Sequence, residues 1–101
     1  MVMTFKDWRN KSGTTDRDCR CGSWSQHWLN FSNTAWPGTC SVLGCKTWPG
    51  HGGHVYSNSD PNRHEFIVPL CAQHNGSDES FGLKLDREPV SANQRKTCEP
   101  D

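Results

Sequence analysis

Two short segments, Cys40-Ser-Val-Leu-Gly-Cys45 and Cys71-Ala-Gln-His74, carry four metal-binding side chains in two pairs. The 25 residues from 46 to 70 separate the pairs, a spacing typical of structural zinc sites, where four such ligands form a tetrahedron. Each pair can bind one ion from a single turn, whereas cysteines this close rarely reach relaxed disulfide geometry with each other. The two segments therefore predict a zinc site that decides the fold.

The composition explains why a metal is needed. The chain has 101 residues, of which 32% are hydrophobic, and its mean hydropathy is -0.87. A purely hydrophobic core in one small domain of this kind is marginal. Zinc contributes on the order of 10 kcal/mol to the folding of small modules, so we expect the metal-free chain to be largely unfolded.

The cysteine count leaves a second interpretation open. Six cysteines allow 15 connectivities of three disulfides, the usual framework of a small secreted protein. The segment from Met1 to Arg9 has no apolar run of signal-peptide length, and no stretch is long enough to span a bilayer. We therefore expect a cytoplasmic protein with free or metal-bound thiols and no membrane association, and a secreted, disulfide-stapled effector is the alternative.

The charges limit the class of partner. The net charge is zero, with 11 basic and 11 acidic side chains, so the chain lacks the overall cationic field of a non-specific nucleic-acid binder. The only charged residues between 21 and 76 are Lys46, Asp60, Arg63 and Glu65. The chemistry of this segment is aromatic, glycine-rich and amide-rich, which favours a protein partner slightly over a nucleic acid.

We divide the chain into a flexible N-terminal arm, residues 1–18, and a single zinc-binding domain, residues 19–101. The arm is polar and shows no sustained hydrophobic period, so it is either flexible or loosely docked, with Trp8 and Phe5 as the residues expected to pin one end of it. The domain begins with a short predicted helix whose apolar stripe is Trp24, Trp28 and Phe31, with Ser23 as N-cap.

The zinc knuckle, residues 40–45, comes next, with Gly44 suited to its turn. The predicted elements after it are a turn-rich loop (48–54), a hairpin of two strands (55–56 and 65–68) ended by Pro69, a helix beginning at 70–74, a strand (81–85) and a helical turn (90–96). The predicted fold is therefore a small, metal-stabilised α+β domain.

Knuckle, hairpin and a helix that carries the last ligands is the element order of a treble-clef zinc finger, here with an N-terminal helix packed on it. Gly53-His54-Val55 followed by Ile67 to Asn75 resembles the ββα-metal core of HNH-type nucleases. The chain also resembles small uncharacterised bacterial proteins that combine such a core with the pattern Cys-Gly-Ser-Trp-x-x-His-Trp, here Cys21 to Trp28.

The resemblance implies roles for single residues. The four paired ligands match the structural zinc ligands of the family, and His54 matches its catalytic histidine, the general base. The family's asparagine is missing from residues 65–68, and Asn75 stands where a histidine normally binds the catalytic metal. His51 or Asp78 would have to replace that ligand, so the resemblance implies an incomplete nuclease site.

A second predicted zinc site uses the remaining cysteines: Cys19, Cys21, His27 and Cys98. His54 and His51 are alternative imidazole ligands. A disulfide from Cys98 to Cys19 or Cys21, or unpaired thiols, are the other interpretations of these residues.

The other notable residues have plain structural interpretations. We expect the tryptophans at positions 24, 28, 36 and 48 to replace an aliphatic core around the knuckles, rather than to stack on bases. We expect His51, His64 and the charges at 78–79 and 86–88 to be solvated. For His54, a structural hydrogen bond and metal ligation compete with catalysis.

These observations favour a non-catalytic, zinc-stabilised module that binds a protein or a nucleic acid, with Zn²⁺ as its cofactor and no small-molecule cofactor. The alternative is an HNH-like, metal-dependent endonuclease with His54 as general base.

Overall fold

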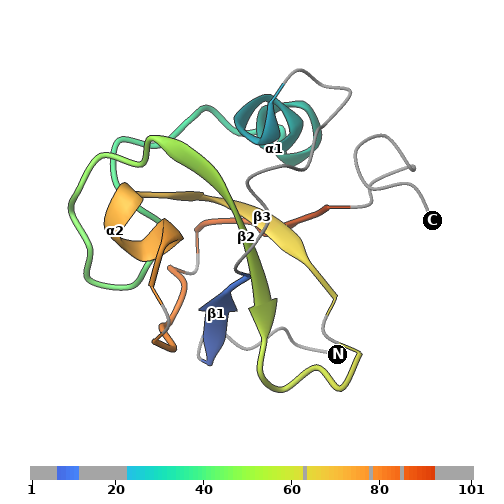
Figure 1. Ribbon diagram of the computed structural model, residues 1–101. Coiled ribbons are helices and arrows are strands. Elements are labelled where there is room, and N and C mark those ends of the chain that lie inside the picture. Colours follow the sequence, from blue (N-terminus) through green and yellow to red (C-terminus); the bar gives the residue numbers. More distant parts are fainter. Residues whose placement is uncertain (1–6, 12–22, 63, 78, 85, 93–101) are drawn as a thin grey trace.

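A computed structural model describes residues 7–11, 23–62, 64–77, 79–84 and 86–92. They form a small α+β fold with one antiparallel sheet of four strands in the order β1-β2-β3-β4 (Figure 1). The elements in chain order are β1 (Trp8–Asn10), α1 (Trp24–Ser32), β2 (His51–Ser57), β3 (Phe66–Leu70), α2 (Ala72–Asn75) and β4 (Val90–Ser91).

The central hairpin of β2 and β3 is confirmed, but both strands are longer than the sequence predicts. Their register runs from His51 opposite Leu70 to Val55 opposite Phe66. The predicted loop 48–54 is therefore wrong for its last four residues. Gly52 allows α1 to pack closely against this part of β2, because a Cβ at this position would lie 2.5 Å from the backbone carbon of Trp24 in α1.

Pro69 does not end β3, contrary to the prediction, and the strand continues to Leu70. A proline is tolerated here because β4 pairs only with the other end of β3, at Phe66 and Ile67. The carbonyl of Pro69 accepts a hydrogen bond of 2.9 Å from the N–H of Ser41, and this bond joins the strand to the knuckle.

Within the predicted arm, the segment Trp8–Asn10 forms the edge strand β1, which pairs with the end of β2. Trp8 is only 1% exposed, and it exchanges two backbone hydrogen bonds with Phe81, of 2.9 and 2.8 Å. The buried indole of Trp8 therefore fixes this strand, although the neighbouring residues are polar. Residues 1–6 and 12–22, with the proposed boundary at 19, lie outside the described residues.

The C-terminal segment also differs from its prediction. Phe81 and Leu83 each form a single bridge, with Trp8 and Val42, in place of the predicted strand. The start of the predicted helical turn, Val90–Ser91, is strand β4, whose partners on β3 bury Val90. Residues 93–96 lie outside the described part of the chain.

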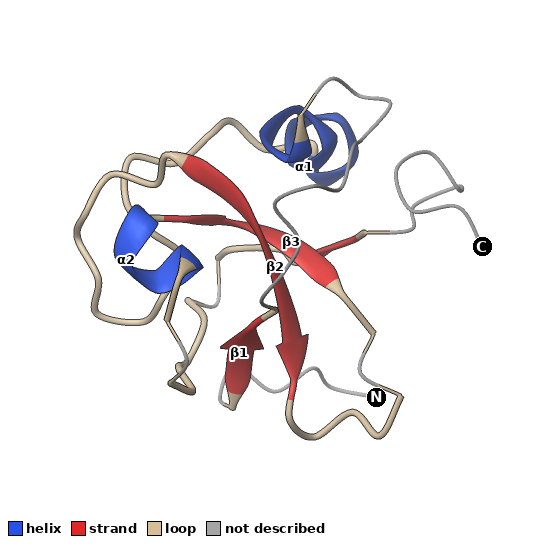
Figure 2. Cartoon of the chain, in the orientation of Figure 1, coloured by secondary structure: helices blue, strands red, loops and turns tan. Residues whose placement is uncertain are grey.

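The sheet separates two packed layers, and Figure 2 shows the two helices as separate blue segments beside it. We call the side covered by α1 the α1 face and the side that carries the knuckle and α2 the knuckle face. The buried cluster of the α1 face is Trp28, Ile67, Val90 and Ala92, with Trp24, Leu29, Phe31 and Trp36 at its margin. The buried cluster of the knuckle face is Trp8, Cys40, Val42, Val55, Val68, Leu70, Cys71 and Leu83.

The helix α1 is confirmed together with its cap and its stripe. The hydroxyl of Ser23 accepts a 3.0 Å hydrogen bond from the N–H of Gln26, and the helix ends at Asn33 with a φ of 57°. Trp28 is fully buried, and its indole N–H donates to the carbonyl of Glu88 over 2.8 Å. Trp28 therefore contacts β3 through Ile67 and binds the C-terminal segment through Glu88.

The tryptophans do not all lie where the sequence predicts. Trp24, Trp28 and Trp36 pack on the α1 face, on the other side of the sheet from the knuckle. Trp48 is 63% exposed, so the prediction of a core position is wrong for this residue. Trp8, which the sequence placed in the arm, is the tryptophan that packs beside the knuckle.

Within the described residues, no helix is long and apolar enough to cross a membrane.

Candidate metal centre

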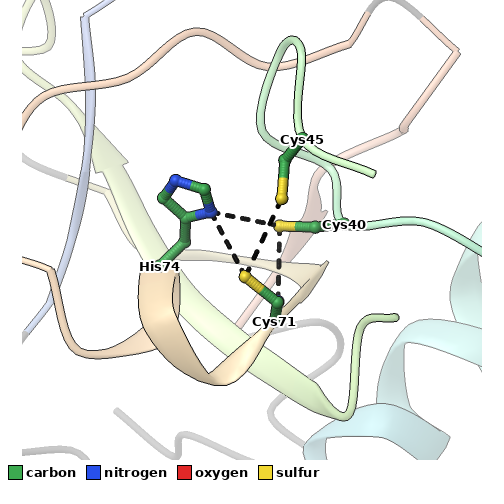
Figure 3. A group of neighbouring side chains, drawn as sticks. All are labelled: Cys40, Cys45, Cys71 and His74. Atoms are coloured by element: carbon green, nitrogen blue, oxygen red, sulfur yellow. Dashed lines mark hydrogen bonds between the residues drawn. The ribbon is translucent and has the colours of Figure 1, made fainter. Parts of the chain in front are cut away.

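The two predicted ligand pairs meet on the knuckle face, as Figure 3 shows. The ligand atoms of Cys40, Cys45, Cys71 and His74 all lie within 4.8 Å of one another. The imidazole Nδ1 of His74 lies 3.6 Å from the sulfur of Cys40 and 3.3 Å from that of Cys71. The sulfurs of Cys45 and Cys71 are 3.9 Å apart. The four side chains are therefore close enough to bind one metal ion.

The first pair is presented by a closed turn. The N–H of Cys40 donates to the carbonyl of Thr47 over 2.7 Å, and the N–H of Cys45 donates to that of Val42 over 3.0 Å. Gly44 has a φ of 84°, in the left-handed region that glycine adopts without strain. These bonds hold the two sulfurs on the same side of the turn.

The second pair follows directly from the end of β3. Cys71 is the N-cap of α2, and His74 lies three residues later on the same side of this single helical turn. The N–H of Cys71 donates to the sulfur of Cys40 over 3.3 Å, so a backbone bond already joins the two pairs. The prediction of a helix from residue 70 is corrected slightly, because Leu70 belongs to β3.

The environment of the sulfurs differs within the site. Cys40 is fully buried, and this desolvation raises the pKa of its thiol to about 11 despite backbone hydrogen bonds from Val42 and Cys71. At Cys45, burial also raises the pKa, but hydrogen bonds from Thr47 and the neighbouring thiols outweigh it, so the pKa lies below its ordinary value. The hydrogen bonds at both sulfurs favour the thiolate form that a metal needs, but they outweigh burial only at Cys45.

The three cysteines of the site are free thiols. A disulfide requires about 2.05 Å between sulfurs, far less than the separation of Cys45 and Cys71. Among the described residues, these three thiols therefore form no disulfide with one another.

The second predicted zinc site is not assembled in the described residues. Cys19, Cys21 and Cys98 lie outside them. His27 is fully buried in α1, and its Nε2 lies 2.9 Å from the carbonyl of Ser91. It contacts the rings of Trp24 and Phe31, on the opposite side of the sheet from the cysteine cluster. The second site therefore stays a prediction.

His54, the residue that matches a catalytic histidine, is only 1% exposed. Its ring meets the indole of Trp24 edge-on, with 4.3 Å between ring centroids, beneath α1. A general base has to contact the water that it activates. This burial argues against catalysis and favours the structural interpretation.

The candidate replacement ligands are no closer to forming a catalytic site. His51 is exposed at the start of β2, and Asp78 lies outside the described residues. His64 is exposed as predicted, but it is not simply solvated, because its Nδ1 bonds the carboxylate of Asp60 over 2.9 Å. Backbone N–H bonds from His64 and Asn62 lower the pKa of Asp60.

The contacts of two residues beside the knuckle were not predicted from the sequence. Lys84 and Arg87 donate hydrogen bonds to the knuckle and to Thr39, which precedes it. The predicted solvated face at 86–88 is wrong for Arg87, whose side chain is only 10% exposed. No local pattern distinguishes this arginine from its exposed neighbours Asp86 and Glu88.

Comparison with protein-family models, with curated proteins and with solved structures finds no match for this chain.

Proposed function

We propose that this protein is a non-catalytic interaction module whose treble-clef fold is stabilised by Zn²⁺ at Cys40, Cys45, Cys71 and His74. The observation that carries the proposal is the meeting of these four ligand atoms within 4.8 Å. The order of knuckle, hairpin and short ligand-bearing helix supports the treble-clef assignment.

The distances favour a tetrahedral zinc ion. With Zn–S bonds of about 2.3 Å and Zn–N bonds of about 2.0 Å, ligands in a tetrahedron lie about 3.8 Å apart for two sulfurs and about 3.5 Å for sulfur and nitrogen. The separations of 3.9 Å for Cys45–Cys71, 3.6 Å for Cys40–His74 and 3.3 Å for Cys71–His74 are close to these values. All four ligand atoms lie within 4.8 Å of one another, so side-chain movements of about 1 Å would load the site.

The donor set favours zinc over other cations. Three thiolates and one imidazole are soft or borderline ligands, whereas Mg²⁺ and Ca²⁺ prefer oxygen. Four protein ligands also complete the coordination shell of zinc, which leaves no position for a reactive water. A closed shell is the mark of a structural site, and it supports a module without metal-dependent catalysis.

The surface beside the metal centre supports an interaction role. Leu43, 57% exposed, lies in the knuckle, and Trp48, 63% exposed, follows Cys45 by three residues. Trp48 is fixed on both sides, because Thr47 accepts the N–H of Cys40, and the buried Pro49 accepts the indole N–H of Trp36 over 2.9 Å. An exposed indole on a fixed backbone is a common anchor in protein interfaces, since tryptophan supplies a large contact area with few rotatable bonds.

A protein partner suits this surface better than a nucleic acid. No aspartate or glutamate occurs between Asp18 and Asp60, so this surface is not acidic. Lys46 is the one lysine or arginine between Cys40 and Trp48. Nucleic-acid binding draws its affinity from several phosphate contacts, each of which needs a cation. One exposed lysine beside two apolar side chains fits an apolar protein pocket with an acidic neighbour.

Native mass spectrometry of protein purified without added metal tests the zinc assignment. We expect one zinc per chain that Cys71→Ser removes and His64→Gln, a matched change of an exposed histidine, retains. A second zinc lost only in Cys19→Ser would establish the other predicted site. Wild-type protein without metal, and with a mass lower by bonded thiol hydrogens, would contradict the proposal and favour the disulfide alternative.

The interaction role has a separate test. A random peptide library displayed on phage, selected on wild-type protein and depleted on Trp48→Ser, should yield peptides that bind only the former. Labelled single-stranded DNA should show no binding that weakens steeply with salt, and plasmid DNA should not be nicked with Mg²⁺, Mn²⁺ or Ni²⁺. Nicking that His54→Ala abolishes while zinc is retained would favour the endonuclease instead.

A further inference from the structure

Two cationic side chains reach the knuckle from the segment after Leu83. The ammonium of Lys84 donates to the carbonyl of Cys45 over 2.7 Å and to the hydroxyl of Thr39 over 3.0 Å. The guanidinium of Arg87 donates through Nη2 to the same hydroxyl over 2.8 Å and to the Thr39 carbonyl over 3.3 Å. The hydroxyl oxygen of Thr39 therefore accepts a hydrogen bond from both cations. Thr39 directly precedes the ligand Cys40, and Lys84 also binds the carbonyl of the ligand Cys45.

The backbone places these side chains by pairing with the knuckle. The N–H of Leu43 donates to Gly82 over 2.8 Å, and the N–H of Lys84 donates to Ser41 over 2.9 Å. Leu83 is 3% exposed in the buried cluster of the knuckle face. The segment 82–84 therefore pairs with the knuckle and places Lys84 beside it, and we call this segment the C-terminal brace.

The charge of the two cations is poorly balanced among the described residues. The carboxylate closest to Arg87 is that of Asp86, at 3.4 Å and 81% exposed, a pair that water screens strongly. Within the same part of the chain, the Nε of Arg87 is buried without a hydrogen-bond partner. Within the described ranges, the hydrogen bonds of Lys84 go to neutral oxygens. Adjacent, partly buried cations are stabilised by a nearby negative charge.

The loaded metal centre supplies such a charge. Zn²⁺ with three thiolates and a neutral imidazole carries one net negative charge. The carbonyl that Lys84 binds belongs to Cys45, one of those ligands, so the ammonium lies next to a residue whose thiolate would bind the metal. Charges that face each other in a buried site interact more strongly than charges in water.

We infer that Lys84 and Arg87 are positioning residues that hold the knuckle in its metal-binding form and counter the negative charge of the loaded site. This inference rests on the proposed zinc function, and it makes the C-terminal brace part of the metal centre. Partners just outside the ligand shell typically change metal affinity 10- to 100-fold.

The test is the Zn²⁺ dissociation constant, measured by competition with a chromophoric chelator. We expect Lys84→Met to weaken binding by about 10- to 100-fold, and Lys84→Arg, which retains the charge, to stay within about 3-fold of wild type. Lys46→Met is the matched control, because Lys46 is exposed and directly follows Cys45. Cobalt absorption spectra should show the same tetrahedral ligand set in every variant.

A second background separates charge from hydrogen bonding. His74→Cys gives four thiolates and two net negative charges, so the penalty of Lys84→Met should become larger there. An equal penalty in both backgrounds would overturn the charge role. A loss below about 2-fold in Lys84→Met, or an equal loss in Lys46→Met, would overturn the inference while the zinc site stands.

Two further results are decisive. Should Lys84→Met fail to fold with metal, Lys84→Gln takes its place, since it retains a donor without the charge. Wild-type protein that binds no zinc would overturn the proposed function, and with it this inference.

Discussion

The two faces of the sheet are stabilised by different means. The α1 face is closed by large aromatic residues, with Trp28 fully buried against Ile67. The knuckle face has mainly aliphatic side chains of moderate size, and two of its buried members, Cys40 and Cys71, belong to the cluster that lies close enough to bind a metal ion. Under the proposed zinc function, apolar burial suffices on one side, whereas the other side depends on coordination. The proposal therefore divides the stability of this small chain between two sources.

Metal removal should have the largest effect, and it should fall on the knuckle face first. Zinc sites of this type contribute on the order of 10 kcal/mol or more, so a strong chelator should abolish cooperative folding. Amide hydrogen exchange followed by NMR should show early loss of protection at Cys71–Asn75 and at 40–47. A chelated protein that retains its near-UV circular dichroism would contradict the comparison.

Trp28→Ala should damage the α1 face without emptying the metal site. Truncation of a fully buried tryptophan costs about 3–5 kcal/mol, because it removes apolar burial and leaves a cavity. Chemical denaturation of the zinc-loaded protein measures this loss, with Trp48→Ala as the exposed control at about 0.5 kcal/mol or less. Loss of zinc from Trp28→Ala in native buffer would mean that the two faces are not separable.

Two neighbouring glycines of β2 allow a matched comparison of the faces. A Cβ at Gly52 would lie 2.5 and 2.6 Å from backbone atoms of Trp24 and Ser25, so α1 would have to move. A Cβ at Gly53 meets the side chains of Leu70 and Asn75, which can rotate away.

We expect Gly52→Ala to cost about 1–3 kcal/mol and Gly53→Ala to cost less. The free energies of unfolding of the two zinc-loaded variants measure the difference. The reverse order would show that the knuckle face is the more rigid of the two.

Acid should weaken the knuckle face through the metal. Without metal, the pKa of Cys40 is about 11, so its thiol is protonated at neutral pH, and binding has to displace that proton. Zinc affinity should therefore rise with pH up to that pKa, by about 1.4 kcal/mol per pH unit for each proton released. Calorimetry in buffers of different ionisation enthalpy counts these protons, and a count of zero would contradict the thiolate site.

Ser23→Ala should give the smallest effect, confined to the α1 face. The hydroxyl satisfies the N–H of Gln26 at the start of α1, and loss of such a cap costs about 1 kcal/mol. The thermal unfolding temperature should be lower for Ser23→Ala and close to that of the wild type for Ser23→Asp, whose carboxylate can cap the helix in the same way. An unchanged zinc dissociation constant in both variants would sharpen the separation of the faces.

Local features were predictable from the sequence because their partners lie within a few residues. The cap at Ser23, the stripe of α1 and the β2–β3 hairpin each depend on neighbours in the chain. Each ligand pair likewise depends on one turn. The strand ends were less predictable, since Gly52 and Pro69 normally break strands and are accepted here only because of what lies beside them.

Features made by distant segments were not predictable. β1 forms because a tryptophan from the predicted arm finds a buried position between β2 and Phe81. Arg87 is buried because Thr39, far away in the chain, accepts its hydrogen bonds. Trp48 has the composition of a core residue but is exposed, because its backbone is held at the rim of the knuckle.

The sequence by itself determined that the chain carries two metal-binding turns, since the bite of each pair is set by a few covalent bonds. The tertiary structure alone decided that the two turns meet, because the pairing of β2 with β3 and the bond from Ser41 to Pro69 bring them together. It also decided that His27, on α1, and His54, on β2, both lie on the α1 face, away from the knuckle. A strand alternates its side chains between two faces, and only the packed sheet fixes which face each one occupies.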